Sequence, residues 1–307
     1  MRVLFTGATG VLGREAIPEL VRAGHRVTAA VRDLSDTEWM ARLGVEISPV
    51  DLFDPVAVRR LADNHDAVVH FATSIPPQAR FTKRNAWSLN DRLRSEATAN
   101  LVDAALRAEA EVFIQQSVSF VYADGGAHWL DEGSRVEPVW DVLDSALVAE
   151  RHVARFAELG GRGIALRLGR LYGPGRASGE LLDAVAARKV PIIGDGTNFV
   201  SYVHAVDAGR AVAAALTAPG GTYNVTDLAP VSVIEDLGVV SDLLDAGGAR
   251  RLPYALARVV AGQAARMLTV SQRVSSELFR TVTGWEPSVP SVREGWPEIV
   301  AQRRAAA

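Results

Sequence analysis

The chain has 307 residues, of which 48% are hydrophobic and 22% are charged, and its formal net charge is −3. This composition is typical of a globular protein. It argues against nucleic acid or an anionic membrane as the main partner, because both select basic surfaces. The chain has no cysteine, which excludes disulfides and thiolate catalysis. An apolar run leads from Arg2 straight into a glycine loop, so we expect no signal peptide and a cytoplasmic protein.

Six short apolar runs in the first part of the chain predict β-strands, because strands buried on both faces are nearly continuously apolar. They are Val3–Thr6, Arg26–Val31, Val45–Val50, Ala67–Phe71, Val112–Gln116 and Gly163–Leu168. Helical patterns separate them, at Val11–Ala23, Pro55–Ala62, Asn85–Ala108 and Asp141–Leu159. Repeated strand–helix units predict an α/β fold with a doubly wound, Rossmann-type parallel sheet.

After Tyr172 the pattern becomes less regular, and Gly173, Pro174 and Gly175 interrupt it. We therefore expect residues 1–170 to form a dinucleotide-binding Rossmann domain. Residues 171–307 are expected to form mainly a smaller C-terminal substrate-binding lobe, with some segments returning to the Rossmann core.

A glycine loop lies between the first predicted strand and the first predicted helix, with glycines at positions 7, 10 and 13. Gly7 permits a tight turn, Gly10 allows the backbone to approach a pyrophosphate, and Gly13 allows the helix to pack closely on the sheet. The helix N-terminus offers N–H groups to the phosphates. The loop is not a Walker A motif, since no Lys-Ser/Thr pair follows it. The pattern predicts a dinucleotide site.

The end of the second predicted strand indicates which dinucleotide is bound. An NAD site usually carries an acid here, for the ribose 2′-hydroxyl. This chain has Val31 followed by Arg32, whose guanidinium can pair with a 2′-phosphate. Asp33 is the alternative, because it could serve as the acid of a slightly longer strand. We favour NADPH over NADH.

From these residues the chain resembles the extended and atypical short-chain dehydrogenase/reductases, the group of nucleotide-sugar epimerases, dehydratases and related reductases. The matching segments are Thr6–Gly13, Asp51–Leu52, His70–Ala72, Ser117–Tyr122, Arg167–Gly175, Tyr202–Asp207 and Tyr223–Thr226. The resemblance implies a cofactor site made of Gly7, Thr9, Gly10, Val11, Leu12, Gly13, Arg32, Asp51, Leu52, Ala72, Thr73, Ser117, Leu168 and Gly169. His70 and Asp207 are more simply explained as a core histidine and a helix-terminal charge, and Asp51 as a helix cap.

The family's catalytic groups are a Ser or Thr, a Tyr, and a Lys four residues after the Tyr. No Tyr-x-x-x-Lys sequence occurs in this chain. With Glu150 as the reference for alignment, Val142 stands at the Tyr place and Ala146 at the Lys place. Val118 stands at the Ser place, between Ser117 and Ser119. The chain therefore resembles the family's fold and departs from its acid–base chemistry.

A proton donor must then come from water, from the substrate or from another side chain. By position we single out Ser119, Thr73 and Tyr202 as catalytic candidates; Ser74, Tyr172 and His204 are further candidates. Arg170 could bind an oxyanion. The proline-rich segment Ser74–Phe81 is a lid candidate, and Trp129 and Trp140 are candidate walls for a flat substrate, although packing explains them equally well.

The resemblance extends to tyrosine-lacking tailoring ketoreductases of bacterial aromatic polyketide pathways. It implies an NADPH-dependent ketoreductase acting on a bulky, polycyclic ketone. Two alternatives remain open: a non-catalytic NADP(H)-binding sensor, and a non-redox isomerase or lyase on the same fold. We expect a small-molecule substrate, no metal, no nucleic acid, no membrane, and a monomer or homodimer. The six histidines show no metal-ligand spacing.

Overall fold

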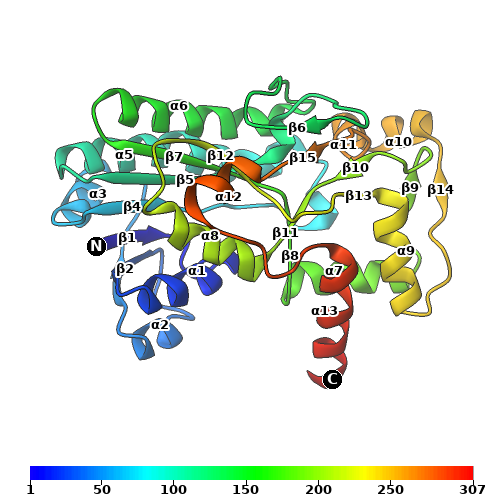
Figure 1. The fold of residues 1–307 in the computed structure, drawn as a ribbon, viewed down its shortest axis with the longest axis horizontal. Coiled ribbons are helices and arrows are strands. Elements are labelled where there is room, and N and C mark those ends of the chain that lie inside the picture. The colour runs from blue at the N-terminus through cyan, green and yellow to red at the C-terminus, as the bar shows by residue number, and fades with distance from the viewer. Residues whose placement is uncertain (307) are drawn as a thin grey trace.

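The computed structural model describes residues 1–306, and its centre is a seven-stranded parallel sheet in the order β12-β7-β5-β4-β1-β2-β3 (Figure 1). The strands are β1 (Arg2–Thr6), β2 (Arg26–Val31), β3 (Glu46–Pro49), β4 (Ala67–His70), β5 (Val112–Val118), β7 (Arg162–Leu168) and β12 (Gly221–Val225). The expected Rossmann-type α/β fold is confirmed. Each of the six predicted strands is present, with its ends within two residues of the prediction.

Helices cover both faces of the sheet (Figure 1). One face carries α1 (Val11–Arg22), α2 (Glu38–Arg42), α8 (Ala205–Ala215) and α12 (Glu277–Thr283). The other carries α3 (Pro55–Ala62), α5 (Thr98–Arg107) and α6 (Asp144–Glu158). Strand β1 shows how the sequence divides between them: Val3 and Phe5 pack on the first face and Leu4 on the second. Side chains alternate across a strand, so an apolar run feeds both cores.

The single long helix predicted at Asn85–Ala108 is wrong. The structure has η2 (Arg84–Trp87), α4 (Ser88–Arg92), the π-helical turn η3 (Leu93–Ala97) and then α5. The Leu93 carbonyl accepts the backbone N–H of Thr98 in the π turn, and it also accepts hydrogen bonds from His70 Nε2 at 3.1 Å and Thr98 Oγ1 at 3.2 Å. The interruption therefore follows from a tertiary contact with the end of β4, which hydrophobic periodicity does not report.

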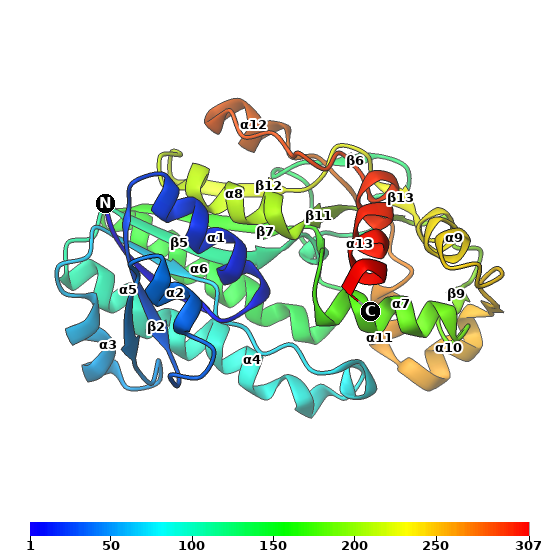
Figure 2. The ribbon, with the colours of Figure 1, turned by 90° about the horizontal axis from the view of Figure 1, so that it is seen from below.

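The C-terminal elements gather at the end of the molecule towards which the parallel strands run (Figure 2). Their apolar cluster is built on α7 (Arg176–Ala186), α9 (Val233–Leu243) and α13 (Val292–Ala306). Two further helices are α10 (Tyr254–Ala261) and α11 (Gln263–Met267). Short strands pair as β8 (Arg170–Tyr172) with β11 (Tyr202–His204), β10 (Phe199–Val200) with β13 (Val231–Ser232), β9 (Ile192–Ile193) with β14 (Arg251–Leu252), and β6 (Trp129–Leu130) with β15 (Arg273–Val274).

The remaining short helical turns are η1 (Gln78–Arg80), η4 (Ser119–Val121) and η5 (Asp141–Leu143), the last of which leads into α6. Within residues 1–306, no helix has both the length and the apolar character needed to cross a membrane. The carboxyl ends of the parallel strands thus face the C-terminal elements, and this is the edge at which doubly wound sheets bind ligands.

Candidate active site

The glycine loop between β1 and α1 requires glycine at two positions for steric reasons. Gly7 has φ +81°, and a Cβ there would lie 2.5 Å from the carbonyl carbon of Phe71. A Cβ on Gly13 would lie 2.3 Å from the carbonyl oxygen of Ala8. Gly10 closes the turn by donating its N–H to the carbonyl of Gly7 at 3.0 Å. The loop therefore has the close backbone packing that the sequence predicts.

The N-terminus of α1 suits an anion. Its N-cap residue, Gly10, has no side chain to occupy the first N–H groups, and no acid lies in the first turn. Thr9 is exposed, Val11 is 40% exposed, and Leu12 packs into the core. Open N–H groups at the positive end of a twelve-residue helix fit a pyrophosphate. The residues present thus fit a dinucleotide, which the Rossmann fold implies.

Around the expected adenosine end, Arg32 and Asp33 differ in availability. The Arg32 side chain is 88% exposed and only 3.7 Å from the Asp33 carboxylate. Asp33 accepts hydrogen bonds from the N–H and hydroxyl of Ser35, and these bonds lower the pKa of its carboxyl group. The Asp33 carboxylate is therefore engaged in its own turn.

Asp51 and Leu52 follow β3. Asp51 is exposed and accepts the N–H of Phe53 at 2.9 Å, while the Leu52 carbonyl accepts the Asn100 side-chain amide at 3.0 Å. Reading Asp51 as the cap of the following helix is wrong. The cap is Asp54, which accepts the N–H groups of the first turn of α3.

At the end of β4, His70 is fully buried and has a structural place. Thr6 Oγ1 lies 2.6 Å from its Nδ1, and its Nε2 donates to the Leu93 carbonyl. Burial lowers the pKa of His70 to about 4, so the ring is neutral at physiological pH. The connection that follows carries Ala72, half-buried, and Thr73, exposed, at the strand end where the cofactor is expected.

A buried polar network joins the ends of β5 and β7 to α6. The Arg167 guanidinium donates to both oxygens of the Glu150 carboxylate, at 2.9 and 2.7 Å, and Ser117 Oγ donates to the same carboxylate at 2.5 Å. Arg167 also donates to the Tyr122 hydroxyl, which in turn donates to Asn224. Ser117 and Glu150 thus belong to one hydrogen-bonded network, and the Ser117 hydroxyl proton is engaged by Glu150.

The face of η5 and α6 that should carry the family's acid–base pair is apolar and buried. Val142 is 1% exposed and Ala146 is 0% exposed. Val142 packs in an aromatic cluster, which we define by Phe81, Trp87 and Trp140. The three rings contact one another at centroid distances of 5.1 to 5.4 Å. The substitutions therefore leave packing and no titratable group on this face.

The three catalytic candidates occupy different surroundings. Tyr202 is 2% exposed and donates its hydroxyl to Asp236 at 2.6 Å, within the C-terminal core. Ser119 is 2% exposed on η4, and Thr73 is exposed on the connection after β4. The structure thus places Ser119 and Thr73 at the ends of neighbouring strands and directs the Tyr202 hydroxyl away from them, to Asp236.

The other sequence candidates are also occupied by packing. Tyr172 and His204 stack against each other at 5.2 Å beneath α13. Arg170 lies over the rings of Phe120 and Tyr202, each at 5.7 Å. Asp207 accepts from Ser288, Val289 and Arg210, a structural role. The two tryptophans predicted as walls for a flat substrate also differ: Trp140 is buried, whereas Trp129 is 50% exposed and lies under Arg273.

Further along β7, Leu168 is buried in the sheet core, and Gly169 donates its N–H to the Val225 carbonyl at 3.0 Å. A Cβ at Gly169 would lie 2.9 Å from the Ser201 carbonyl oxygen. This close approach lets β8 and β11 continue beyond the main sheet, which carries the chain from the cofactor half into the C-terminal half.

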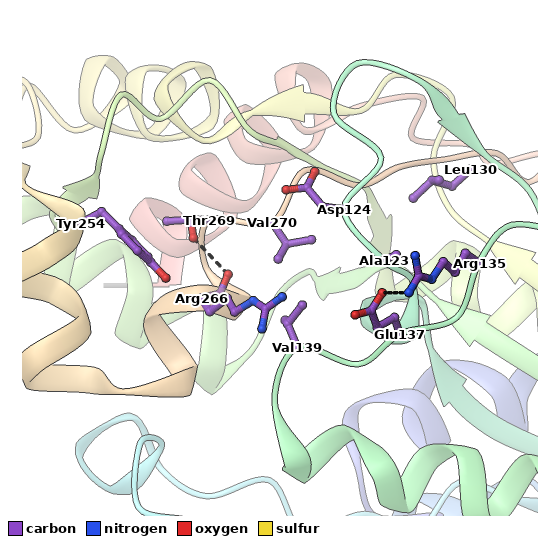
Figure 3. Close-up of a pocket in the computed structure, with 10 residues that line it drawn as sticks. All are labelled: Ala123, Asp124, Leu130, Arg135, Glu137, Val139, Tyr254, Arg266, Thr269 and Val270. Atoms are coloured by element: carbon purple, nitrogen blue, oxygen red, sulfur yellow. Dashed lines mark hydrogen bonds and ion pairs between the residues drawn. The ribbon is translucent and has the colours of Figure 1, made fainter.

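A cavity of about 470 Å³ lies between the loop after η4 and the C-terminal helices (Figure 3). Tyr254 of α10 and Arg266 of α11 stand on one side, and Arg135, Glu137 and Val139 on the other. Arg135 pairs with Glu137 at 2.8 Å, while Arg266 extends into the space between the two walls (Figure 3). A cavity between the Rossmann edge and the C-terminal elements is a natural substrate site.

Two polar residues of the α4–η3 segment, Asn90 and Arg94, are 0% and 2% exposed, and neither was predicted from the sequence as a candidate functional residue. They continue the buried helical stripe of Ala97, Thr98 and Leu101 at spacings of four and three. That stripe was a usable signal: an amide and a guanidinium on a buried face require an explanation.

Comparisons with known proteins agree with this geometry. The NAD dependent epimerase/dehydratase family matches residues 3–226. A 3-diazoavenalumate denitrifying reductase from a Streptomyces species is 35% identical over 96% of this chain and 99% of its own. The chain therefore belongs to the NAD dependent epimerase/dehydratase family, the extended short-chain dehydrogenase/reductases, and is an NAD(P)-dependent oxidoreductase.

Solved structures share the fold at low identity. UDP-glucose 4-epimerase from Thermus thermophilus, in complex with NAD, has a TM-score of 0.80 at 22% identity, covering all of both chains. The dTDP-glucose 4,6-dehydratase from Streptomyces venezuelae, with NAD bound, has a TM-score of 0.81 at 20% identity, covering 99% of this chain and 97% of its own.

Proposed function

We propose that this chain reduces an aromatic electrophile whose reduction needs a hydride but no proton from the protein, and that the electrophile is an aryl diazonium group. One observation carries the proposal: Val142 and Ala146, buried and apolar, stand where the family's Tyr and Lys are expected. An enzyme that must protonate an alkoxide needs a donor at that place. A reaction without such a step does not.

Aryl diazonium reduction meets this condition. A bound reduced nicotinamide would supply the hydride. The ring carbon gains the C–H bond, the C–N bond breaks, and its electron pair leaves with dinitrogen, so charges balance without a proton. The relative that is 35% identical is named a 3-diazoavenalumate denitrifying reductase, which describes a reduction that removes nitrogen from a diazo compound.

The chain's own residues would bind and orient the reactants. The loop Gly7–Gly13 and the α1 N-terminus would hold the pyrophosphate, with Asp51 and Leu52 near the adenine and Ala72 and Thr73 near the nicotinamide ribose. Phe81, the half-buried member of the aromatic cluster, would contact a flat ring, since aromatic side chains favour offset or edge contacts with arenes. Positioning of this kind supplies a large part of the rate enhancement.

For the cofactor, we propose NADPH. Arg32 is exposed at the end of β2, where a 2′-phosphate would lie, and the competing acid Asp33 is engaged by Ser35. The residues that line the cavity from α10 and α11 support a substrate-binding role for residues 171–307.

A second candidate keeps the ketone expected from the sequence: reduction of a polycyclic ketone, with the proton taken from water or from the substrate. The exposed position of Thr73, after the end of β4, favours this candidate. A non-catalytic NADP(H) sensor and a non-redox isomerase or lyase are the remaining alternatives.

The test is anaerobic turnover of an arenediazonium salt with NADPH, followed by loss of the nicotinamide absorbance, with heat-denatured protein as the background. NADPH deuterated at C4 should place deuterium on the ring carbon, and deuterium oxide should place none there. Turnover of polycyclic ketones alone would favour the second candidate. Tight NADPH binding without oxidation of NADPH on either substrate class would overturn both, in favour of the sensor or the non-redox enzyme.

A further inference from the structure

The α4–η3 segment presents Asn90 and Arg94 towards the end of β4. The residues are four positions apart, which places both on one face of a helix. Asn90 Oδ1 accepts the N–H of Ser74 at 3.1 Å, so this face lies directly under the connection that leaves β4. The two side chains thus stand beside the carboxyl edge of the sheet, where the substrate is expected.

Both side chains carry donors without acceptors. Arg94 Nε and Asn90 Nδ2 are buried and have no hydrogen-bond partner within the described part of the chain. A buried donor left unsatisfied costs about 1–3 kcal/mol, and more when it is charged. Since natural proteins satisfy nearly all such groups, two of them on one face indicate an acceptor that a ligand provides.

Arg94 also lacks a carboxylate that is hydrogen-bonded to it. Burial lowers the pKa of its guanidinium to about 10, which still leaves it protonated at neutral pH. The nearest carboxylates, Asp91 and Glu150, act on it electrostatically but make no hydrogen bond with it. Glu150 is bound by Arg167 and Ser117, and Asp91 pairs with Arg84 through Oδ2 at 2.6 Å, while the Oδ1 of Asp91 is buried without a hydrogen-bond partner in the described part of the chain. A buried cation in this position is costly unless an anion joins it.

We infer that Arg94 and Asn90 bind a carboxylate group of the substrate. A guanidinium fork and an amide donor match the two oxygens of a carboxylate. The anionic part of a dinucleotide is already provided for by the α1 N-terminus, and its nicotinamide ribose is neutral. The inference deepens the proposed function, on which it rests, by making the substrate an aromatic carboxylic acid.

The test measures binding, which does not depend on turnover. Full-length protein saturated with NADP⁺ is titrated with cinnamate and with its neutral amide, by calorimetry. We expect wild type to prefer cinnamate. Arg94→Met should weaken cinnamate binding about 10- to 100-fold and leave the amide and NADP⁺ unchanged. Arg92→Met is the matched control, because Arg92 ends α4 directly before η3, is exposed, and pairs with Glu96. It should bind cinnamate as wild type does.

Two further variants keep the inference testable if Arg94→Met fails to fold. Arg94→Lys keeps the charge without the fork and should lose part of the preference for cinnamate. Asn90→Asp places a permanent counter-charge beside Arg94, so it should raise the melting temperature and abolish the preference. Unchanged cinnamate affinity in Arg94→Met or Asn90→Asp would overturn the inference, as would loss of NADP⁺ affinity in place of cinnamate affinity. Failure of diazonium turnover alone would refute only the proposed function.

Discussion

Two regions meet at the carboxyl edge of the sheet, the glycine loop of residues 6–13 and the inner face of α6. In the loop, Gly7 and Gly13 have no room for a Cβ, and no acid opposes an anion at the α1 N-terminus. At η5 and the start of α6, the places expected for a Tyr and a Lys hold Val142 and Ala146, both buried by packing. Glu150, one turn beyond Ala146, is retained and paired with Arg167.

The difference separates two requirements that usually occur together, a site for the dinucleotide and a proton donor for the substrate. The loop keeps each steric feature that a dinucleotide needs, whereas the α6 face keeps its fold-supporting pair and has no proton donor. A protein that lost function altogether would have no reason to keep the first. The contrast therefore favours a reaction that uses a nicotinamide cofactor and needs no acid from the protein. The predictions below test each side of it.

The largest effect is expected from the ion pair between Glu150 of α6 and Arg167 of β7. Glu150→Ala leaves Arg167 buried without its counter-ion, and breaking a buried pair costs about 3–5 kcal/mol. Urea unfolding should show this loss, while Glu158→Ala, an exposed change on the same helix, should not. Equal midpoints for the two variants would mean that the pair is not structural.

His70 joins the end of β1, through Thr6, to η3, through Leu93. Its pKa is about 4 in the fold, below the usual 6.5, so the unfolded chain binds more protons between these values. Stability should therefore fall as pH drops from 6.5 to 4, by at most ~3 kcal/mol. His70→Gln should remove this part of the pH dependence. Parallel curves for wild type and variant would contradict it.

On the loop side, Gly10→Val should weaken NADPH binding about 10- to 100-fold, because added bulk meets the Gly7 carbonyl and the pyrophosphate path. Fluorescence titration measures it. Gly238→Val is the control, since a Cβ there meets no atom within 4 Å. Unchanged affinity in Gly10→Val would remove the loop from the cofactor site.

Restoring a Tyr and a Lys at positions 142 and 146 should not raise the activity. Ala146→Lys, alone or with Val142→Tyr, adds bulk and a buried charge to a packed face and should cost about 1–3 kcal/mol of stability. Diazonium turnover should not rise in either variant. A large gain in ketone reduction would show instead that a missing proton donor limits the natural protein.

The smallest effect concerns the choice of dinucleotide. Arg32→Ala should weaken NADPH binding about tenfold, as expected for one exposed charged contact. NADH binding should stay the same. Arg26→Ala, at the opposite end of β2, serves as the control. A parallel loss for both dinucleotides would contradict recognition of the 2′-phosphate by Arg32.

Much of the fold was determined by local sequence. Apolar runs between glycine turns predicted six strands of the parallel sheet, because strands buried on both faces leave a simple pattern. The steric demands on Gly7 and Gly13 are equally local, since they depend on one tight turn and the adjoining strand. The absence of a Tyr-x-x-x-Lys sequence needed only the residues themselves.

Only the tertiary structure decided how the polar residues are used. It broke the predicted helix at Leu93 to meet His70, engaged Ser117 with Glu150, and directed the Tyr202 hydroxyl to Asp236. It also buried Arg94, on which Asp91 and Glu150 act electrostatically without a hydrogen bond. Periodicity reports which face of an element is apolar. Hydrogen bonds and charge compensation depend on partners far away in sequence, so their outcome appears only when the elements are packed together.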